Sequence, residues 1–303
     1  MAMMQNKTVI VTGAGRGVGK AVALAFAEAG ANVGVNDIGV TLEGAETGES
    51  PADEVVAEIK AAGGNAIALK QSVAEWDAAH AMVEQTVDAF GSIDGIVNNA
   101  GNLRDMIFHK MTEDDFDSVI NVHLKGTFNM SRAAAPHFKI QESGVFLHMT
   151  STSGLVGNFG QANYCAAKLG IVGLSKAIAL DMQRFGVRSN AVAPFAWTRM
   201  VSSIPTDTPA QQKRVEGLKK LVPERLAPFA VAMCSDHAKH VSGQVFGVRN
   251  NEIYLFSQNR PIRTAHTSDG WTPESVIERA LPMFENDFYP LHRSGDVFTW
   301  DPV

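Results

Sequence analysis

The sequence predicts an α/β fold, in which a doubly wound parallel sheet has helices on both faces and is followed by a C-terminal extension. Short runs rich in β-branched residues alternate with Ala-rich amphipathic stretches of helical length, which is the pattern of βαβ units. The expected strands span residues 8–12, 32–36, 66–69, 95–98, 144–150 and 187–193. Because the carboxyl ends of parallel strands meet at one edge of the sheet, we expect a ligand site there.

Composition excludes several classes of partner. The 303 residues are 45% hydrophobic, and the formal net charge of −6 is scattered along the chain, so we expect no nucleic-acid partner. No apolar run is long enough to cross a membrane, and we expect no membrane partner. Cys165 and Cys234 lack the spacing of metal ligands, so we expect no metal. Without a recognisable secretory segment, the expected location is the cytoplasm.

Three segments interrupt the alternation of strands and helices. Residues 39–50 read as a solvated surface loop, and residues 195–222 follow the sixth strand, where a substrate lid would lie. Residues 251–303 contain many aromatic side chains that need cover. We therefore expect one domain over residues 1–250 and an extension, residues 251–303, packed on it over the active site or at a subunit contact.

A glycine-rich loop follows the first strand and precedes a helix expected from Lys20 to Ala29. Glycine lets the backbone approach a pyrophosphate closely, and the free N–H groups at the start of a helix favour an anion. An ordinary tight turn is the alternative, but the order of strand, loop and helix favours a dinucleotide site. The expected contacts from this loop are Gly13, Arg16, Gly17, Val18 and Gly19.

Asp37 closes the second strand, where a carboxylate can accept hydrogen bonds from adenosine ribose hydroxyls and repel a 2′-phosphate. Arg16 could instead pair with such a phosphate. We expect NAD as the cofactor, because Asp37 would face the extra phosphate directly. The run from Asn98 to Gly101 is either a simple turn at a strand end or the place where the nicotinamide half crosses the sheet.

Tyr164 and Lys168 are four residues apart in a long helical pattern over residues 161–185, so both side chains emerge on one face. A solvated surface pair is the alternative. It is disfavoured because Ser151 ends the preceding strand at the edge of the sheet where the glycine-rich loop lies. A phenol with an ordinary pKa of about 10 needs a nearby cation to act as a base near neutral pH, and Lys168 supplies one.

These motifs, in this order, resemble the short-chain dehydrogenase/reductase family, which has a Rossmann fold: Thr12-Gly-x-x-x-Gly17-x-Gly19, Asn98-Asn-Ala-Gly101, Ser151 and Tyr164-x-x-x-Lys168. The resemblance implies that Tyr164 is the general acid/base and that Ser151 holds the reacting oxygen. It implies that Lys168 binds the nicotinamide ribose and lowers the tyrosine pKa, and that Asn121 assists a proton relay through water. Ser153 rivals Ser151, but the family's thirteen-residue gap to the tyrosine selects Ser151. The further cofactor contacts that it implies are Ser72, Val73, Asn99, Ala100, Gly101, Tyr164, Lys168, Pro194 and Thr198.

A closer resemblance is to the (3R)-hydroxyacyl-CoA dehydrogenase unit of the peroxisomal multifunctional β-oxidation enzyme and its bacterial relatives. The residues of this sequence that carry the resemblance lie at 36–39, 102–105, 157–164 and 271–276. The sequence departs from this pattern at Gln71, where an adenine-contacting Asp is usual, and at Phe195, where Gly is commonest. The hydratase and sterol-carrier domains do not occur in the sequence.

We consider three functions, two of which are implied by these resemblances. The first is NAD-dependent oxidation of a (3R)-3-hydroxyacyl-CoA to the 3-ketoacyl-CoA, in β-oxidation or in the breakdown of a steroid side chain. The second is dehydrogenation of a free hydroxysteroid or another secondary alcohol without CoA. The third, a non-catalytic NAD-binding scaffold, has no need of all four predicted catalytic residues. Basic residues in the lid could meet CoA phosphates or be solvated: Arg199, Lys213, Arg214, Lys219 and Lys220.

We also expect a homodimer or homotetramer. Helices predicted over residues 112–138 and 161–185 are rich in Ala and Leu on more than one face, and the corresponding helices pair across a two-fold axis in relatives. We expect residues 251–303 to fold back near the lid and help shape an acyl pocket, because about fifty residues are marginal for a core of their own.

Overall fold

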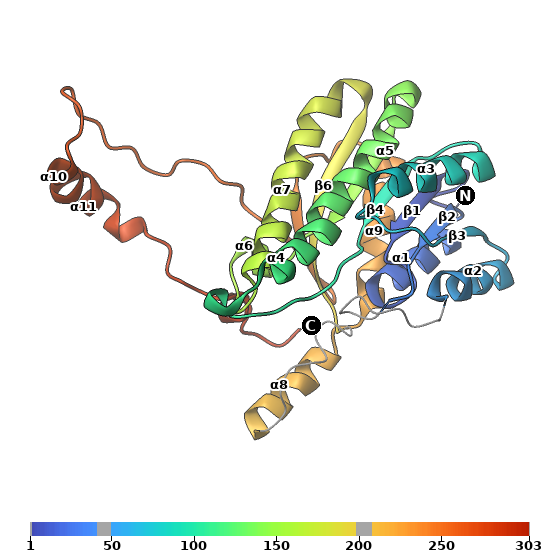
Figure 1. Ribbon diagram of the computed structural model, residues 1–303, viewed down its shortest axis with the longest axis horizontal. Helices are drawn as coiled ribbons and strands as arrows, with labels where there is room; N and C mark the ends of the chain where they lie inside the picture. The colour runs from blue at the N-terminus through green and yellow to red at the C-terminus, as the bar shows by residue number, and fades with distance from the viewer. Residues whose placement is uncertain (1, 41–49, 198–207, 303) are drawn as a thin grey trace.

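The computed structural model describes residues 2–40, 50–197 and 208–302. One sheet of eight strands runs through it in the order β3-β2-β1-β4-β5-β6-β7-β8 (Figure 1). The strands are β1 (Thr8–Thr12), β2 (Asn32–Asn36), β3 (Asn65–Leu69), β4 (Gly95–Asn98), β5 (Gly144–Met149), β6 (Val187–Phe195), β7 (Val245–Arg249) and β8 (Glu252–Leu255). All neighbours pair in parallel except β8, which is antiparallel to β7. The predicted fold class is therefore confirmed.

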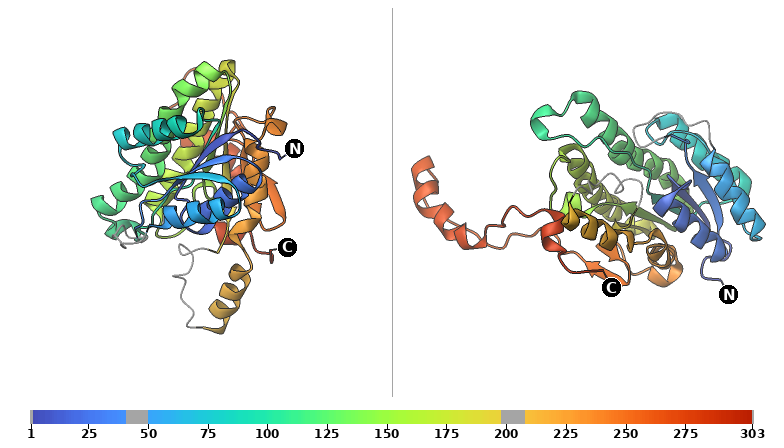
Figure 2. Two further views of the ribbon diagram at one scale, coloured as in Figure 1. Left: turned by 90° about the vertical axis from the view of Figure 1, so that its right-hand side faces the viewer. Right: turned by 90° about the horizontal axis from the view of Figure 1, so that it is seen from below.

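Helices cover both faces of the sheet (Figure 2). On one face lie α1 (Gly17–Glu28), α2 (Pro51–Ala61) and α9 (Ala227–Cys234). The other face is covered by α3 (Trp76–Phe90), α4 (Glu113–Ile120), α5 (Gly126–Gln141) and α7 (Ala162–Met182). The shorter helices are α6 (Thr152–Leu155), α8 (Pro209–Lys219), α10 (Pro273–Ser275), α11 (Leu281–Phe284) and α12 (Ser294–Val297). No helix among the described residues is long and apolar enough to cross a membrane.

The core is split by the sheet into two apolar layers. Every residue of β1 is buried, which is typical of a parallel strand covered on both faces. Successive side chains of a strand point to opposite faces, so Val9 and Val11 join the layer around Phe26 of α1. Ile10 joins the other layer, around Phe138 and Phe146. The six strands predicted from the sequence are all present, and β7 and β8 are additional.

The helix predicted over residues 112–138 is divided into α4, a π-helical turn at Asn121–Lys125, and α5. Thr112 begins α4 with a capping box, because its hydroxyl accepts a hydrogen bond from the Asp115 N–H and the Asp115 carboxylate accepts one from the Thr112 N–H. The π turn inserts an extra residue into the helical repeat and so rotates the side chains that follow it. The π turn includes Asn121, so it affects where this predicted catalytic side chain points.

The extension beyond residue 250 contacts the body at both of its ends. Its first residues form β8, so the sheet crosses the boundary that the sequence suggested between the domain and the extension. Near the C-terminus, Phe298 packs against Phe195 and Tyr254, and Trp300 packs against Tyr254. The segment with α10 and α11 projects away from the sheet between these ends, as Figures 1 and 2 show. The middle of the extension does not lie near α8, the described helix of the lid segment.

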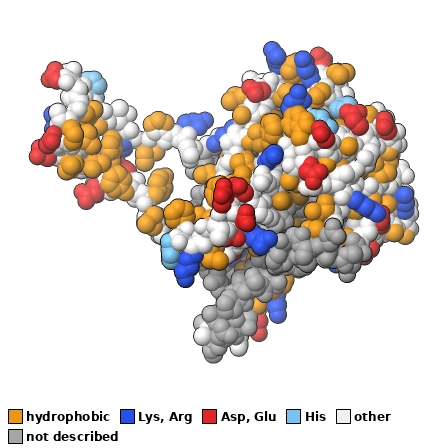
Figure 3. Space-filling view, viewed as in Figure 1, with side chains coloured by type: hydrophobic (Ala, Val, Ile, Leu, Met, Phe, Trp, Pro, Cys, Tyr) orange, Lys and Arg blue, Asp and Glu red, His pale blue; other side chains and the backbone are white. Residues whose placement is uncertain are grey.

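The projecting segment, residues 257–291, is called the arm below. Several apolar side chains on it are exposed, and Figure 3 shows hydrophobic side chains on the surface of the arm. They are Ile262, Trp271, Ile277, Leu281, Met283, Phe288, Tyr289 and Leu291. An exposed apolar group of this kind marks an interaction surface more often than a free one.

Candidate active site

A cleft of about 790 Å³ lies at the carboxyl edge of the sheet, as predicted from the fold. All of the described residues that the sequence predicted for cofactor binding and catalysis line it, except Asn121. Those that line it are Gly13, Arg16, Gly17, Val18, Gly19, Asp37, Ser72, Val73, Asn99, Ala100, Gly101, Ser151, Tyr164, Lys168 and Pro194. Thr198 lies outside the described residues, as do residues 41–49 of the predicted surface loop and residues 198–207 of the lid segment.

The glycine-rich loop fits a dinucleotide because added Cβ atoms would close it. Gly13 has a φ of +61°, and a Cβ on it would lie 2.8 Å from Ala100 Cα. A Cβ on Gly19 would lie 2.1 Å from the carbonyl oxygen of Gly13. Only glycine at these positions lets the turn fold against the loop after β4 and leaves the backbone open to a pyrophosphate.

Side-chain hydrogen bonds fix the loop after β4 against the loop after β1. Asn99 Nδ2 donates to the carbonyl oxygens of Thr12 and Gly13, at 2.9 and 3.1 Å. Thr12 Oγ1 accepts from the backbone N–H groups of Asn99 and Ala100, at 2.9 and 3.0 Å. We call this set of bonds the Thr12–Asn99 clamp. It holds two of the loops that line the cleft in one geometry.

Asp37 is held at the end of β2 by two backbone N–H groups. Gly15 N–H donates to its Oδ2 at 2.9 Å, and Gly39 N–H donates to its Oδ1 at 2.9 Å. Each carboxylate oxygen keeps a second lone pair for another donor. The carboxylate is therefore fixed in the wall of the cleft, with acceptor capacity for the hydroxyl groups of a ribose.

Tyr164, Lys168 and Ser151 meet at the far end of the cleft. Lys168 Nζ lies 5.5 Å from the centre of the Tyr164 ring and donates to the carbonyl oxygen of Met149 at 2.7 Å. Ser151 caps α6, and its hydroxyl accepts from Ser153 N–H at 3.1 Å. Three of the four predicted catalytic side chains thus come together, Ser151 from the start of α6 and Tyr164 and Lys168 from α7.

Burial sets the protonation of this group. It raises the pKa of Tyr164 to about 12, against an opposing hydrogen bond with Ser151. It lowers the pKa of Lys168 to about 7. The cost of removing the phenolate from water is the largest influence on the pKa of Tyr164, and it outweighs the influences that lower this pKa. Tyr164 is therefore a neutral phenol, ready to donate a proton.

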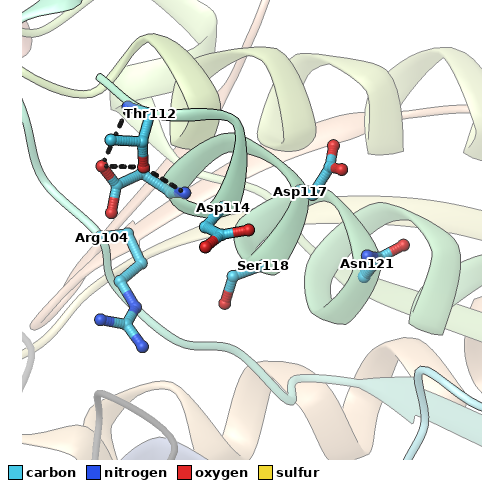
Figure 4. A pocket seen from close by; sticks show the side chains of 7 residues that line it. Arg104, Thr112, Asp114, Asp117, Ser118 and Asn121 are labelled. Carbon is cyan, nitrogen blue, oxygen red and sulfur yellow. Dashed lines mark hydrogen bonds between the residues drawn. The ribbon is translucent and has the colours of Figure 1, made fainter. Parts of the chain in front are cut away.

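Asn121 does not belong to this group, and its predicted place in the site is wrong in this structure. Its side chain is exposed and lines a second pocket, of about 550 Å³, on the outer side of α4 (Figure 4). That pocket is lined by Arg104, Thr112, Asp114, Asp115, Asp117, Ser118 and Asn121. Two residues further along the π turn, His123 faces the cleft instead.

His123 is the residue that the sequence reasoning missed. It is 1% exposed, and its ring stands edge-on to Tyr164, with the ring centres 5.2 Å apart and the planes at 89°. Side chains two positions apart on a helix differ in direction by about 200°, so Asn121 and His123 cannot share a face. In the sequence, its position two residues after Asn121 is the feature that points to a role for His123 in the site.

A further part of the cleft wall is formed by two segments that are far apart in the sequence. Met106 forms a bridge with Gln161, whose Nε2 donates to Asp105 Oδ2 at 2.9 Å. Asn163 Nδ2 donates to the carbonyl oxygen of Arg104 at 2.9 Å. Residues 102–106 and 157–163 therefore form one wall, called the substrate wall below, next to Tyr164.

Comparison with known proteins agrees with this geometry. Residues 7–209 match the family model described as short chain dehydrogenase. A short-chain type dehydrogenase/reductase of Mycobacterium tuberculosis is 45% identical over 248 residues, which are 82% of this chain and 84% of that protein. Peroxisomal multifunctional enzyme type 2 of Mus musculus is 45% identical over 276 residues, 88% of this chain but only 36% of that enzyme.

A solved structure is also similar: 7α-hydroxysteroid dehydrogenase complexed with NADH and 7-oxo glycochenodeoxycholic acid. Its TM-score is 0.74 at 30% sequence identity, and the match covers 82% of this chain and 95% of that one. The family model, the identities and the sheet order agree with one another. This chain belongs to the short-chain dehydrogenase/reductase family and is an oxidoreductase that acts on CH–OH groups.

Proposed function

We propose that the protein oxidises a (3R)-3-hydroxyacyl-CoA to the 3-ketoacyl-CoA, with NAD as the cofactor. The observation that carries this proposal is the substrate wall. Its two segments, residues 102–106 and 157–163, contain the motifs that resemble hydroxyacyl-CoA dehydrogenase units, and they pair with each other beside Tyr164. The 45% identity to a peroxisomal multifunctional enzyme supports the same substrate class.

The residues of the cleft divide the chemistry among them. Oxidation removes a hydride from the carbinol carbon and a proton from its hydroxyl, and bound nicotinamide supplies the hydride acceptor. Tyr164 takes the hydroxyl proton, and in the reverse direction it donates one to the ketone oxygen. Ser151 holds the reacting oxygen by a hydrogen bond, and burial of the group excludes competing water.

NAD is proposed over NADP because of Asp37. Its carboxylate is held in the wall of the cleft by the N–H groups of Gly15 and Gly39, where a 2′-phosphate would meet a negative charge. Arg16 also lines the cleft and is the residue that would favour the phosphate. The similarity to a structure solved with NADH supports the same choice.

A free hydroxysteroid is the second candidate substrate. The similarity to 7α-hydroxysteroid dehydrogenase, at a TM-score of 0.74, favours it. Both reactions use the same proton and hydride transfers, so the two substrate classes differ only in what the outer part of the cleft must bind.

We also infer that the end of the extension shapes the substrate site and that copies of the chain associate as a homodimer or homotetramer. Ser294 N–H donates to the carbonyl oxygen of Gly157 at 2.8 Å, and the Arg293 guanidinium lies 5.7 Å from the Phe159 ring centre. The C-terminal segment thus braces the substrate wall. Exposed apolar side chains on the arm favour burial against a second copy.

A substrate panel tests the proposed function. NADH formation should be measured with (3R)- and (3S)-3-hydroxyacyl-CoAs, free 3-hydroxy acids and hydroxysteroids. We expect kcat/KM for a (3R)-hydroxyacyl-CoA to exceed that for every CoA-free alcohol by at least about a hundredfold, since CoA adds contacts of several kcal/mol. A higher value for a steroid would replace the first candidate with the second.

The protonation state of Tyr164 predicts opposite pH dependences for the two directions. Oxidation needs the phenol deprotonated, and its pKa is raised to about 12, so kcat/KM for oxidation should rise between about pH 7 and pH 9. Ketone reduction needs the proton and should not rise. As the control, Tyr164→Phe should retain NADH binding but less than about one hundredth of the activity. A flat oxidation profile would contradict the assignment of Tyr164 as the base.

Removing the charge of Asp37 should weaken the preference for NAD. In Asp37→Ser the ratio of kcat/KM for NAD to that for NADP should fall by about tenfold or more, equal to about 1.4 kcal/mol. The matched control is Asp53→Asn, which removes an exposed carboxylate of α2 paired with Lys70 outside the cleft. An unchanged ratio in Asp37→Ser, or a wild type that prefers NADP, would show that Arg16 prevails.

Deleting residues 258–303 keeps β8 but removes the brace on the substrate wall. We expect lower kcat/KM for acyl-CoA with NADH affinity unchanged, measured beside a control that lacks only residues 301–303. Light scattering of both proteins reports the mass of the assembly. Wild-type kinetics together with a smaller assembly would assign the extension to the subunit interface alone.

A further inference from the structure

Asp105 places a carboxylate in the substrate wall. Its side chain lines the cleft, and its Oδ2 accepts a hydrogen bond from Gln161 Nε2 at 2.9 Å. Gln161 is the N-cap residue of α7, three residues before Tyr164, and the N–H of Met106 donates to the carbonyl oxygen of Gly160 at 2.8 Å. The backbone next to Asp105 is therefore paired with the turn that leads into Tyr164, on the side of the cleft where the substrate reacts.

The cation next to Asp105 in the sequence lies in the other pocket. Arg104 lines the second pocket and not the cleft, and Figure 4 shows its side chain there, together with that of Asp114. Among the described residues, Asp105 takes part in no ion pair. Asp105 is also exposed, and contact with water favours the ionised form of a carboxyl group. The cleft therefore has a carboxylate in its wall without a described cation beside it.

The other ionisable groups of the cleft do not offset this charge. Among the described residues, those that line the cleft are Arg16, Asp37, Asp105, His123, Tyr164 and Lys168. The first two belong to the glycine-rich loop and the end of β2, in the part of the cleft proposed for the dinucleotide. Burial lowers the pKa of His123 to about 3 and raises that of Tyr164 to about 12, so both side chains are neutral at pH 7. Burial lowers the pKa of Lys168 to about 7, so this amine is only partly charged at that pH.

The charge of Asp105 acts on the reacting group. Burial is the main cause of the raised pKa of Tyr164, the hydrogen bond with Ser151 opposes it, and the charge of Asp105 raises this pKa further. A carboxylate that disfavours a phenolate at this place also disfavours any other anion bound beside the phenol, because like charges repel each other. An uncharged group in the same position meets no such repulsion.

We propose that Asp105 is a specificity-determining residue, which repels alcohols with a carboxylate close to the carbinol carbon and so favours the uncharged thioester. A free 3-hydroxy acid has its carboxylate carbon two bonds from the carbinol carbon. With its hydroxyl at Ser151 and Tyr164, this carboxylate would lie beside the substrate wall. In a 3-hydroxyacyl thioester the same carbon belongs to a neutral carbonyl group. The inference rests on the proposed function, because it concerns how the site distinguishes the acyl thioester from the acid that hydrolysis of the thioester releases.

A matched pair of substrates separates the effect of charge from the contacts of CoA. The pair is (3R)-3-hydroxybutanoate and its methyl ester, which differ by one methyl group and one negative charge. We expect the wild-type kcat/KM for the ester to exceed that for the acid by about tenfold or more. Asp105→Asn keeps an acceptor oxygen for Gln161 but removes the charge, and it should lower this ratio by about tenfold. The value for the acid should rise, and the value for the ester should rise less, because Tyr164 ionises more easily in this variant.

Two further variants serve as controls. Asp105→Glu retains the charge and should keep the ratio of ester to acid within about threefold of the wild-type ratio. Asp114→Asn removes an exposed carboxylate that lines the second pocket but not the cleft, and its ratio should equal that of the wild type. An unchanged ratio in Asp105→Asn, or an equal fall of the ratio in Asp114→Asn, would overturn the proposal.

Salt provides a second test, which uses the wild type and does not depend on a variant that folds. Ions screen the charge of an exposed carboxylate, so the ratio of ester to acid should fall when KCl is raised from about 0.05 M to about 1 M. A wild-type ratio that does not change with salt would contradict the proposal. If the wild type oxidises neither compound, their inhibition constants against the alcohol that it does oxidise give the same comparison. Failure of the acyl-CoA proposal therefore leaves the test of Asp105 intact.

Discussion

The Thr12–Asn99 clamp is the interaction on which the geometry of the site depends. The strand order reverses between β1 and β4, and the two loops that leave these strands must diverge to open a crevice. Without the clamp the loops would be free to separate. Each hydrogen bond contributes about 0.5–1.5 kcal/mol, so the four together offset much of the entropy lost by ordering two glycine-rich turns.

A second polar network lies beneath the site and fixes the strands that lead to it. Asn98 Nδ2 and His148 Nδ1 lie 3.1 Å apart, and His148 Nε2 lies 3.0 Å from Ser189 Oγ, which in turn lies 2.9 Å from Ser175 Oγ. The chain of contacts joins β4, β5, β6 and α7. A shift of α7 along the sheet would leave these buried groups unpaired. The network therefore fixes the position of α7, and with it Tyr164 and Lys168, relative to the strands.

The local part of this architecture could be predicted, and the part set by distant contacts could not. The six strands, the glycine-rich loop and the Tyr164–Lys168 pair follow from short-range patterns in the sequence. His123 faces the cleft and Asn121 does not, and this depends on a π turn that helical periodicity in the sequence does not reveal. The pKa of Tyr164 depends on how deeply other elements bury it, and the pairing of β8 with β7 depends on chain reversal at Asn250, whose φ is +51°.

The extension begins and ends at nearly the same place on the body. It leaves the sheet after β8, and Phe298 returns to within 6.4 Å of the Phe256 ring centre. A chain whose two ends are already joined can change its length at little thermodynamic cost, about 0.6 kcal/mol for each doubling. The arm is therefore a position where evolution can lengthen, shorten or exchange a segment without disturbing the sheet, and where a reporter domain could be inserted for the same reason.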